Sequence, residues 1–345
     1  MLIIQKNARK CLTKIKKYSL IIVQCIVLHA CINGKGVVVV CWAKKFNKFF
    51  AEMWRNRWLY VLLIPGILFF AIFKYVPMAG LKIAFMDYNQ YNPAASEWVG
   101  MAQFVKLFSK RSFFPVLRNT IVISLLKLVI GFPIPVILAL MMNEMRNIRF
   151  KKVSQTLLYL PHFISWVILS GMIMNLLDPD SGLITKLIEM LTGETIMVLT
   201  SKKWFVPMLI ITDIYKGMGW GTILYFAAMS GIDPQLYEAA QIDGAGRWKQ
   251  VIHITLPSIV PTIVIAFIMN CGNILNAGFD QIFMLYSSHV YEVADIIDTY
   301  VYRMGIINND YSFSTAAGMF KSVVALILVL LVNNIAKRTG NSGLF

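Results

Sequence analysis

Long apolar runs separated by polar segments dominate the chain from about residue 58 onward. Six runs are long enough to cross the hydrocarbon core of a bilayer, which takes about 20 residues of helix. A span surrounded by lipid must satisfy its own backbone hydrogen bonds, so we expect every run to be helical. The predicted spans are 58–76, 119–142, 153–177, 204–230, 258–286 and 315–336.

The composition agrees with this pattern. Of the 345 residues, 58% are hydrophobic and only 14% are charged, and the mean hydropathy is +0.65. A soluble domain of this length would carry far more charge. We therefore expect an all-α membrane protein with several spans.

Basic residues predict the orientation of the spans. Residues 1–57 carry twelve Lys or Arg residues against Glu52 alone, so most of the net charge of +16 precedes the first span. Further basic residues follow the second span at 146–152 and the sixth span at Lys337 and Arg338. Under the positive-inside rule both termini are cytoplasmic, and so is the segment 231–257. The basic residues of 77–118 depart from the rule, but a loop this long crosses with little regard to charge.

The N-terminal region has a different character. We expect residues 1–53 to form a basic extension, disordered or lying in part before the true translation start, for which Met53 is a candidate. A signal-peptide core at 20–30 is the alternative. Residues 54–345 would then be the six-helix transmembrane domain. Four of the five cysteines lie in the extension and Cys271 lies in the fifth span, so neither a disulfide framework nor a metal site is indicated.

The segment between the fourth and fifth spans has its own helical signals. Asp233 suits a helix N-cap, Pro234 suits the first helical position, and Gly244 is a natural stop. These signals predict about two turns of helix over 235–242, which an ordinary amphipathic connector would also explain. From Glu238 to Pro257 the sequence reads EAAQIDGAGRWKQVIHITLP.

This segment resembles the EAA loop of binding-protein-dependent ABC importer permeases, with Glu-Ala-Ala, Asp-Gly-Ala and Leu-Pro at the family's offsets. The runs 73–78, 118–120, 131–133 and 159–166 resemble the LplB-like branch, which imports complex oligosaccharides. The resemblance covers about 54–345. It implies a six-transmembrane-helix type I ABC importer permease with a cytoplasmic EAA coupling helix in the bacterial inner membrane.

The resemblance also implies partners. These are a homologous second permease subunit, two ATP-binding subunits, an extracellular solute-binding protein, an oligosaccharide substrate and the lipid bilayer. The residues expected to couple to the ATPase are Glu238, Ala239, Ala240, Asp243, Gly244, Ala245, Gly246 and Pro257. No segment reads as a Walker A loop. ATP and Mg would therefore be used by the partner ATPase, with no cofactor bound by this chain and no catalytic residues in it.

Polar residues inside the spans are candidates for the substrate path, because they are costly in lipid. Asn270, Asn273 and Asn276 have helical spacing in the fifth span, and their amides suit either sugar hydroxyls or bonds between helices. In the fourth span Asp213, Lys216 and Trp220 share a face. Asp213 and Lys216 would neutralise each other, or a free Lys216 would suit an acidic sugar.

Several aromatic and basic side chains near the spans have weaker signals. Trp166, Trp220 and Tyr286 would either stack on sugar rings or lie at the membrane interface. We expect His162 to make a polar contact at a helix start, Lys127 to have no obvious partner, and Lys321 to snorkel.

Four alternative functions are weighed against an oligosaccharide importer. An importer of another solute, such as a glycerol phosphate ester, has the same sequence signals. A secondary transporter or channel would show an inverted repeat with paired broken helices, which the sequence does not display. A membrane enzyme would need a nucleophile, base and orienting group, and no such set is recognisable. A nucleic-acid-binding protein is disfavoured because no basic stripe interleaved with aromatic residues follows the N-terminal region.

Overall fold

The structure is a computed structural model that describes residues 54–338. The expected N-terminal extension, 1–53, lies outside the described residues. Within them the chain divides after Gly80 into a unit of residues 54–80 and a unit of residues 81–338.

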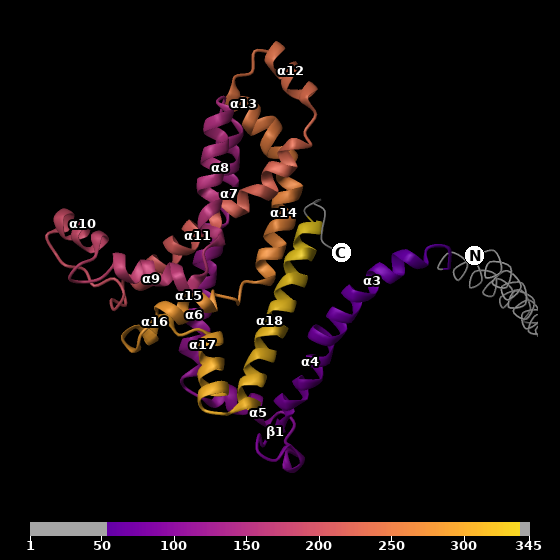
Figure 1. The fold of residues 1–345 in the computed structure, drawn as a ribbon, viewed down its shortest axis with the longest axis vertical. Coiled ribbons are helices and arrows are strands. Elements are labelled where there is room, and N and C mark those ends of the chain that lie inside the picture. The colour runs from indigo at the N-terminus through magenta and orange to yellow at the C-terminus, as the bar shows by residue number, and fades with distance from the viewer. Residues whose placement is uncertain (1–53, 339–345) are drawn as a thin grey trace, which may run out of the picture. The chain divides into compact units, whose positions relative to one another are not determined.

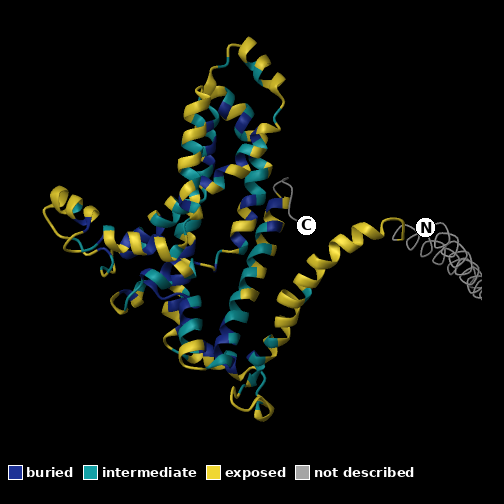
Figure 2. Ribbon diagram, viewed as in Figure 1, coloured by how far each residue is buried: buried dark blue, intermediate teal, exposed yellow. Residues whose placement is uncertain are grey.

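The first unit is helical. Helix α3 (Arg57–Phe70) continues through a π-turn, η1 (Ala71–Tyr75), into α4 (Val76–Met78), and no residue of these elements is buried. Figure 2 shows this exposure along the whole of α3. A helix this apolar is typical of a membrane span. With the 3₁₀ turn η2 (Ala79–Phe85) the helical stretch reaches 29 residues, longer than the predicted 58–76.

The second unit begins with a small hairpin that the sequence did not predict. Strands β1 (Met86–Asp87) and β2 (Glu97–Trp98) pair antiparallel, with the 3₁₀ turn η3 (Pro93–Ala95) between them. Helix α5 (Ala102–Ser109) follows. The next helical stretch starts at Phe113, six residues before the predicted span, and is built from α6 (Phe113–Leu126), the π-turn η4 (Lys127–Gly131) and α7 (Pro133–Asn143).

The predicted span 153–177 is broken in the structure. Helices α8 (Ile148–Phe163) and α9 (Trp166–Leu176) meet at an angle of 100°. The Ser165 hydroxyl caps α9 by accepting a hydrogen bond from the Ile168 N–H at 3.3 Å. A break of this kind is tolerated at membrane depth only where protein groups satisfy the backbone.

The remaining elements continue along the second unit (Figure 1). They are α10 (Leu183–Thr192), α11 (Phe205–Ser230), α12 (Pro234–Ile242), α13 (Arg247–Gln250), the π-turn η5 (Val251–Thr255), α14 (Leu256–Gly272), α15 (Phe279–Leu285), η6 (Ser288–Val290), α16 (Tyr291–Ala294), α17 (Ile297–Tyr302), the π-turn η7 (Arg303–Ile307) and α18 (Tyr311–Arg338).

The mostly helical membrane architecture is confirmed, whereas the count of six spans stays a prediction. Within residues 54–338, four helical stretches are long and apolar enough to cross a membrane, or five if the bent pair is one span. Helix α11 has 26 residues but is not among them.

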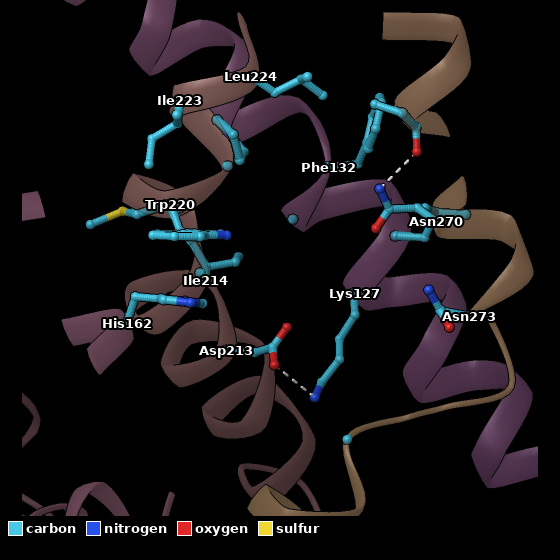
Figure 3. A pocket seen from close by; sticks show the side chains of 18 of the residues that line it. Lys127, Phe132, His162, Asp213, Ile214, Trp220, Ile223, Leu224, Asn270 and Asn273 are labelled. Carbon is cyan, nitrogen blue, oxygen red and sulfur yellow. Dashed lines mark hydrogen bonds and ion pairs between the residues drawn. The ribbon is translucent and has the colours of Figure 1, made fainter. Parts of the chain in front are cut away.

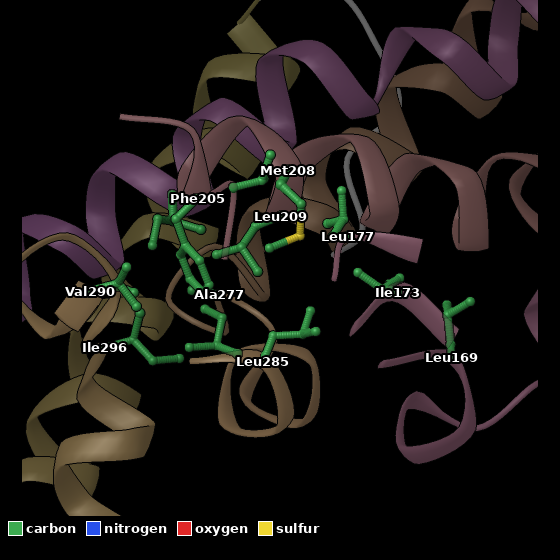
Figure 4. Close-up of a cluster of buried hydrophobic side chains, with 14 residues drawn as sticks. Leu169, Ile173, Leu177, Phe205, Met208, Leu209, Ala277, Leu285, Val290 and Ile296 are labelled. Atoms are coloured by element: carbon green, nitrogen blue, oxygen red, sulfur yellow. The ribbon is translucent and has the colours of Figure 1, made fainter. Parts of the chain in front are cut away.

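Buried apolar side chains hold the second unit together in three clusters. The largest joins α9, α11 and α15 through residues such as Ile173, Leu209 and Leu285 (Figure 4). A second joins α5, α6, α17 and α18, and a third joins α7, α11 and α14. Helices α8 and α11 approach so closely that a Cβ on Gly219 would lie 2.0 Å from the Leu158 carbonyl oxygen. Small residues at such crossings are typical of helix packing in membranes.

Candidate functional site

A cavity of about 760 Å³ lies between η4, α11 and α14, with the end of α8 at its edge (Figure 3). Apolar side chains such as Phe132, Ile214 and Leu224 make up much of the wall. A few polar groups interrupt them. A cavity of about 300–1,000 Å³ with this mixture is typical of sites for small ligands.

Three of the predicted path residues, Asn270, Asn273 and Asn276, line this cavity. They do not form the expected stripe on one helix, because α14 ends at Gly272 and α15 begins at Phe279. The prediction of a continuous span over 258–286 is therefore wrong. Asp280, which the spacing would add to the stripe, is exposed at the start of α15.

The side-chain amides of Asn270 and Asn273 use only part of their hydrogen-bonding capacity. Asn270 Nδ2 donates to the Ala266 carbonyl at 2.8 Å, and Asn273 Nδ2 donates to the Met269 carbonyl at 3.4 Å. Both bonds return to the same helix and use one donor of each amide. The second N–H and the oxygen of each amide therefore have capacity for a ligand that carries hydroxyls.

Trp220 and His162 form an aromatic stack at the other side of the cavity. Their ring centroids are 4.4 Å apart and the rings are parallel within 5°. His162 lies near the end of α8, so the expectation of a contact at a helix start is wrong. Both side chains line the cavity, and Trp220 keeps 48% of its surface exposed. Flat aromatic faces opposite amides can hold a ring that has apolar C–H faces and a polar rim.

Lys216 does not line the cavity and does not pair with Asp213, so both alternatives drawn from the sequence are wrong. Its ammonium donates to the carbonyls of Pro161, at 3.4 Å, His162, at 3.0 Å, and Ile164. These carbonyls lie at the end of α8, where the helix stops, although the Pro161 carbonyl also accepts the Ile164 N–H at 3.2 Å. A lysine at a helix C-terminus also interacts favourably with the helix dipole. Lys216 therefore stabilises the bend between α8 and α9.

Asp213 pairs instead with Lys127, at 3.2 Å, and both line the cavity. The Lys127 side chain keeps only 11% of its surface exposed, whereas Asp213 keeps 40%. The expectation that Lys127 has no partner is wrong. Lys321 also differs from its prediction, because it pairs with Asp298 at 2.6 Å. Among the residues that the structure describes, no cluster of side chains could hold a metal ion.

The helical signals of the segment 231–257 are confirmed. The Asp233 side chain accepts a hydrogen bond from the Gln235 N–H at 3.0 Å, and α12 spans Pro234–Ile242. The chain then turns at Gly244, whose φ of +75° favours glycine. In Figure 1 this segment lies at the end of the second unit that is remote from α5 and α17.

The surface of this segment carries groups that a partner would cover. Glu238 is exposed, and the apolar side chains of Ile242 and Trp248 keep 88% and 78% of their surface exposed. Two such exposed apolar side chains on a polar connector make this segment a candidate for an interaction site.

The path from this segment to the cavity is one continuous helix. The fifth span was predicted to start at 258, but the helix already starts at Arg247 and reaches Gly272. Pro257 lies inside it, directly after the π-turn η5. The Tyr237 and Thr255 hydroxyls, 2.9 Å apart, join α12 to the same helix.

Comparison with known proteins assigns the family. The family described as "Binding-protein-dependent transport system inner membrane component" matches residues 131–341, more than half of the chain. This chain belongs to that family of permeases.

Two permeases of Bacillus subtilis (strain 168) are similar over most of their length. Protein LplB is 48% identical and YteP, a polygalacturonan/rhamnogalacturonan transport system permease protein, is 46% identical. Each alignment covers 88% of this chain, with 96% of LplB and 94% of YteP. A chain in the crystal structure of a bacterial alginate ABC transporter, in complex with alginate pentasaccharide-bound periplasmic protein, is 41% identical with a TM-score of 0.78. The alignment covers 86% of this permease and 99% of the solved chain.

The sequence misassigned one participant in the permease's cavity region, His162, and missed another, Gln281. His162 has no companion ligand in the sequence, and only the fold reveals its stack on Trp220. Gln281 lies next to the exposed Asp280, yet it is buried and bonded to Lys127 at 2.5 Å. Residue spacing in the sequence does not distinguish Asp280 from Gln281, because the break before α15 decides which of the two side chains points inward.

Proposed function

We propose that this permease is a membrane-spanning subunit of an ATP-driven, binding-protein-dependent importer of oligosaccharides. The observation that carries the proposal is the cavity in which the Trp220 and His162 stack lies across from Asn270 and Asn273. Stacked rings suit the C–H faces of a pyranose, and amides suit its hydroxyls. The names of YteP and of the alginate transporter support a carbohydrate substrate.

The proposed assembly has five kinds of contact. This chain pairs with a homologous second permease, and the segment 231–257 docks on one of two ATP-binding subunits, which use the ATP and Mg. An extracellular solute-binding protein delivers the sugar, and lipid surrounds the spans. The chain itself binds no cofactor and catalyses no reaction. We propose six spans with both termini cytoplasmic, in agreement with the basic residues that flank them.

Transport follows an alternating-access cycle. ATP-driven closure of the ATPase pair pushes on α12 and, through the helix from Arg247 to Gly272, moves Asn270 at the cavity wall. Each hydrogen bond between an amide and a hydroxyl contributes only about 0.5–1.5 kcal/mol net. A few such bonds orient a sugar without trapping it, so the substrate is released when the cavity opens inward.

The test is stimulation of ATP hydrolysis by loaded binding protein in the reconstituted complex. Binding proteins loaded with neutral oligosaccharides, uronate oligosaccharides and a glycerol phosphate ester are compared. We expect stimulation by at least one oligosaccharide. Stimulation by the ester alone would exclude a carbohydrate importer, and uptake that persists after the ATPase is inactivated would indicate a secondary transporter or channel.

A further inference from the structure

The fifth span breaks where it forms the cavity wall. The six residues 273–278 separate α14 from α15, and Asn273, Asn276 and Gly278 in this turn line the cavity. Any change in the angle between the two helices therefore changes the shape of the cavity.

The N-terminal side of the break belongs to the helix that begins at Arg247, next to the segment 231–257. Whereas Thr255 near its start bonds to Tyr237 of α12, its Ser258 and Asn270 side chains bond within their own helix. The Ser258 hydroxyl donates to the Ile254 carbonyl at 2.6 Å, and the Asn270 amide donates to the Ala266 carbonyl. Helix α14 packs on α11 and α18. It can therefore shift as a rod without breaking these bonds.

The C-terminal side of the break is held by Lys127. Its ammonium donates to the Ala277 carbonyl at 2.9 Å and to Gln281 Oε1 at 2.5 Å, in addition to its pairing with Asp213. A Cβ on Gly278 would lie 2.7 Å from the ammonium, and the φ of this glycine is +93°. The absence of a side chain at Gly278 therefore leaves the space that the Lys127 ammonium fills.

Gln281, which is bonded to Lys127, also links the start of α15 to α11. Its Nε2 donates to the Leu209 carbonyl at 2.8 Å and to the Thr212 hydroxyl at 2.7 Å. Ala277, Ile282 and Leu285 lie in the same large apolar cluster as Leu209. Polar bonds and packing thus fix the start of α15 against η4 and α11.

We propose that residues 273–278 are the hinge of the transport cycle and that Lys127 is the positioning residue that keeps the C-terminal side of the hinge still. When the coupling segment pushes α14, the turn absorbs the movement, and Asn270 shifts relative to Asn276. Without the anchor, α15 follows α14 and the cavity keeps its shape while ATP is spent. This inference rests on the proposed function, because the push comes from an ATPase.

Two variants test the anchor in the reconstituted complex. Lys127→Met removes the ammonium, and Gln281→Leu removes the link to α11 without altering a residue of the cavity wall. The control is Lys321→Met, which breaks the pair with Asp298, an ion pair of similar partial burial. A hydrogen bond to a charged group contributes about 1.5–3 kcal/mol, so Lys127→Met should lower the sugar transported per ATP hydrolysed by about 10-fold or more.

Gln281→Leu should change this ratio in the same direction, and Lys321→Met should leave it unchanged. An unaltered ratio in both test variants would overturn the proposal. So would an equal loss in the control. Loss of the assembled complex in both test variants would also overturn it, because Lys127 would then serve stability alone.

A second measurement needs no sugar and separates the hinge from the substrate assignment. Nitroxide labels replace the exposed residues Met269 and Asp280, on either side of the turn, in a chain without its native cysteines. We expect vanadate-trapped ADP to change the distance between the labels, and Lys127→Met to abolish the change. An identical distance in both nucleotide states would disprove the hinge, even where sugar stimulation of the wild type succeeds.

Discussion

Trp220 offers the most direct test of the proposal that the cavity binds a sugar. It stacks on His162 and keeps half of its own surface exposed. An aromatic contact contributes about 0.5–1.5 kcal/mol beyond its buried area, so Trp220→Ala should raise the KM for loaded binding protein by about 2- to 10-fold. Initial uptake rates in proteoliposomes measure this. Trp204→Ala, at the start of α11 and outside the cavity wall, is the control, and equal effects would argue against stacking on substrate.

Lys216 leads to a prediction about stability rather than transport specificity. Lys216→Met removes the ammonium that the His162 and Ile164 carbonyls accept from, and each buried polar group left unsatisfied costs about 1–3 kcal/mol. We expect a lower Tm of the purified complex in detergent, measured by intrinsic fluorescence. Lys186→Met, on the exposed surface of α10, should leave the Tm unchanged. A wild-type Tm for Lys216→Met would show that water replaces the lysine.

Individual polar residues could be found from the sequence, but their partners could not. Lys127, Asp213 and Lys216 all stand out in apolar spans, where charges are costly. Spacing on one helix favours the pair Asp213 and Lys216, whereas the fold brings Lys127 to Asp213 from 86 positions earlier. Lys216 donates instead to the backbone carbonyls of His162 and Ile164, at the point where the span breaks.

Among the elements, the turn after α12 leads to a prediction about coupling. Gly244 has a φ of +75°, a conformation that costs other residues roughly 1–2 kcal/mol. Gly244→Ala should therefore misplace Ile242 and Trp248 and reduce the ATPase retained on affinity-purified permease. Gly231→Ala is the matched control, because Gly231 has a φ of −90° and room for a Cβ. Equal retention in both variants would mean that the turn does not shape the docking surface.

Caps could be predicted for α12 because their signals are local. Asp233, Pro234 and Gly244 act on backbone within a few residues, and the structure places the helix between them. The breaks at 164–165 and 273–278 could not be predicted, because hydropathy continues across both. Lys216 and Lys127 arrive from other helices to satisfy the carbonyls that the breaks expose.

At the scale of the whole molecule, orientation is the property to test. Tyr91, in the hairpin, and Ile242, in the coupling segment, keep 89% and 88% of their surface exposed. We replace each with cysteine in a chain without its native cysteines. A membrane-impermeant maleimide should label position 91 in intact cells and position 242 only after permeabilisation. The opposite labelling would invert the topology.

The family and the membrane class could be predicted from the chain as a whole, whereas the number of spans could not be settled. Hydropathy finds apolar length, and the structure agrees for the stretches that include 58–76, 119–142 and 315–336. Helix α11 has the length of a span, but Asp213, Lys216 and several glycines lower its apolar character. A helix enclosed by others does not need the hydropathy of one that faces lipid.

The π-turn η5 sets the rotational phase between the docking end and the cavity end of the helix from Arg247 to Gly272. Each residue of an α-helix advances the chain by about 1.5 Å and rotates it by about 100°. A π-turn accommodates one extra residue, so a regular α-helix over the same residues would turn Trp248 by about a quarter of a revolution relative to Asn270, whereas deleting one residue there would leave the phase nearly unchanged. Both ends would keep their own side chains. The π conformation of this turn therefore decides the direction in which the same push reaches the cavity.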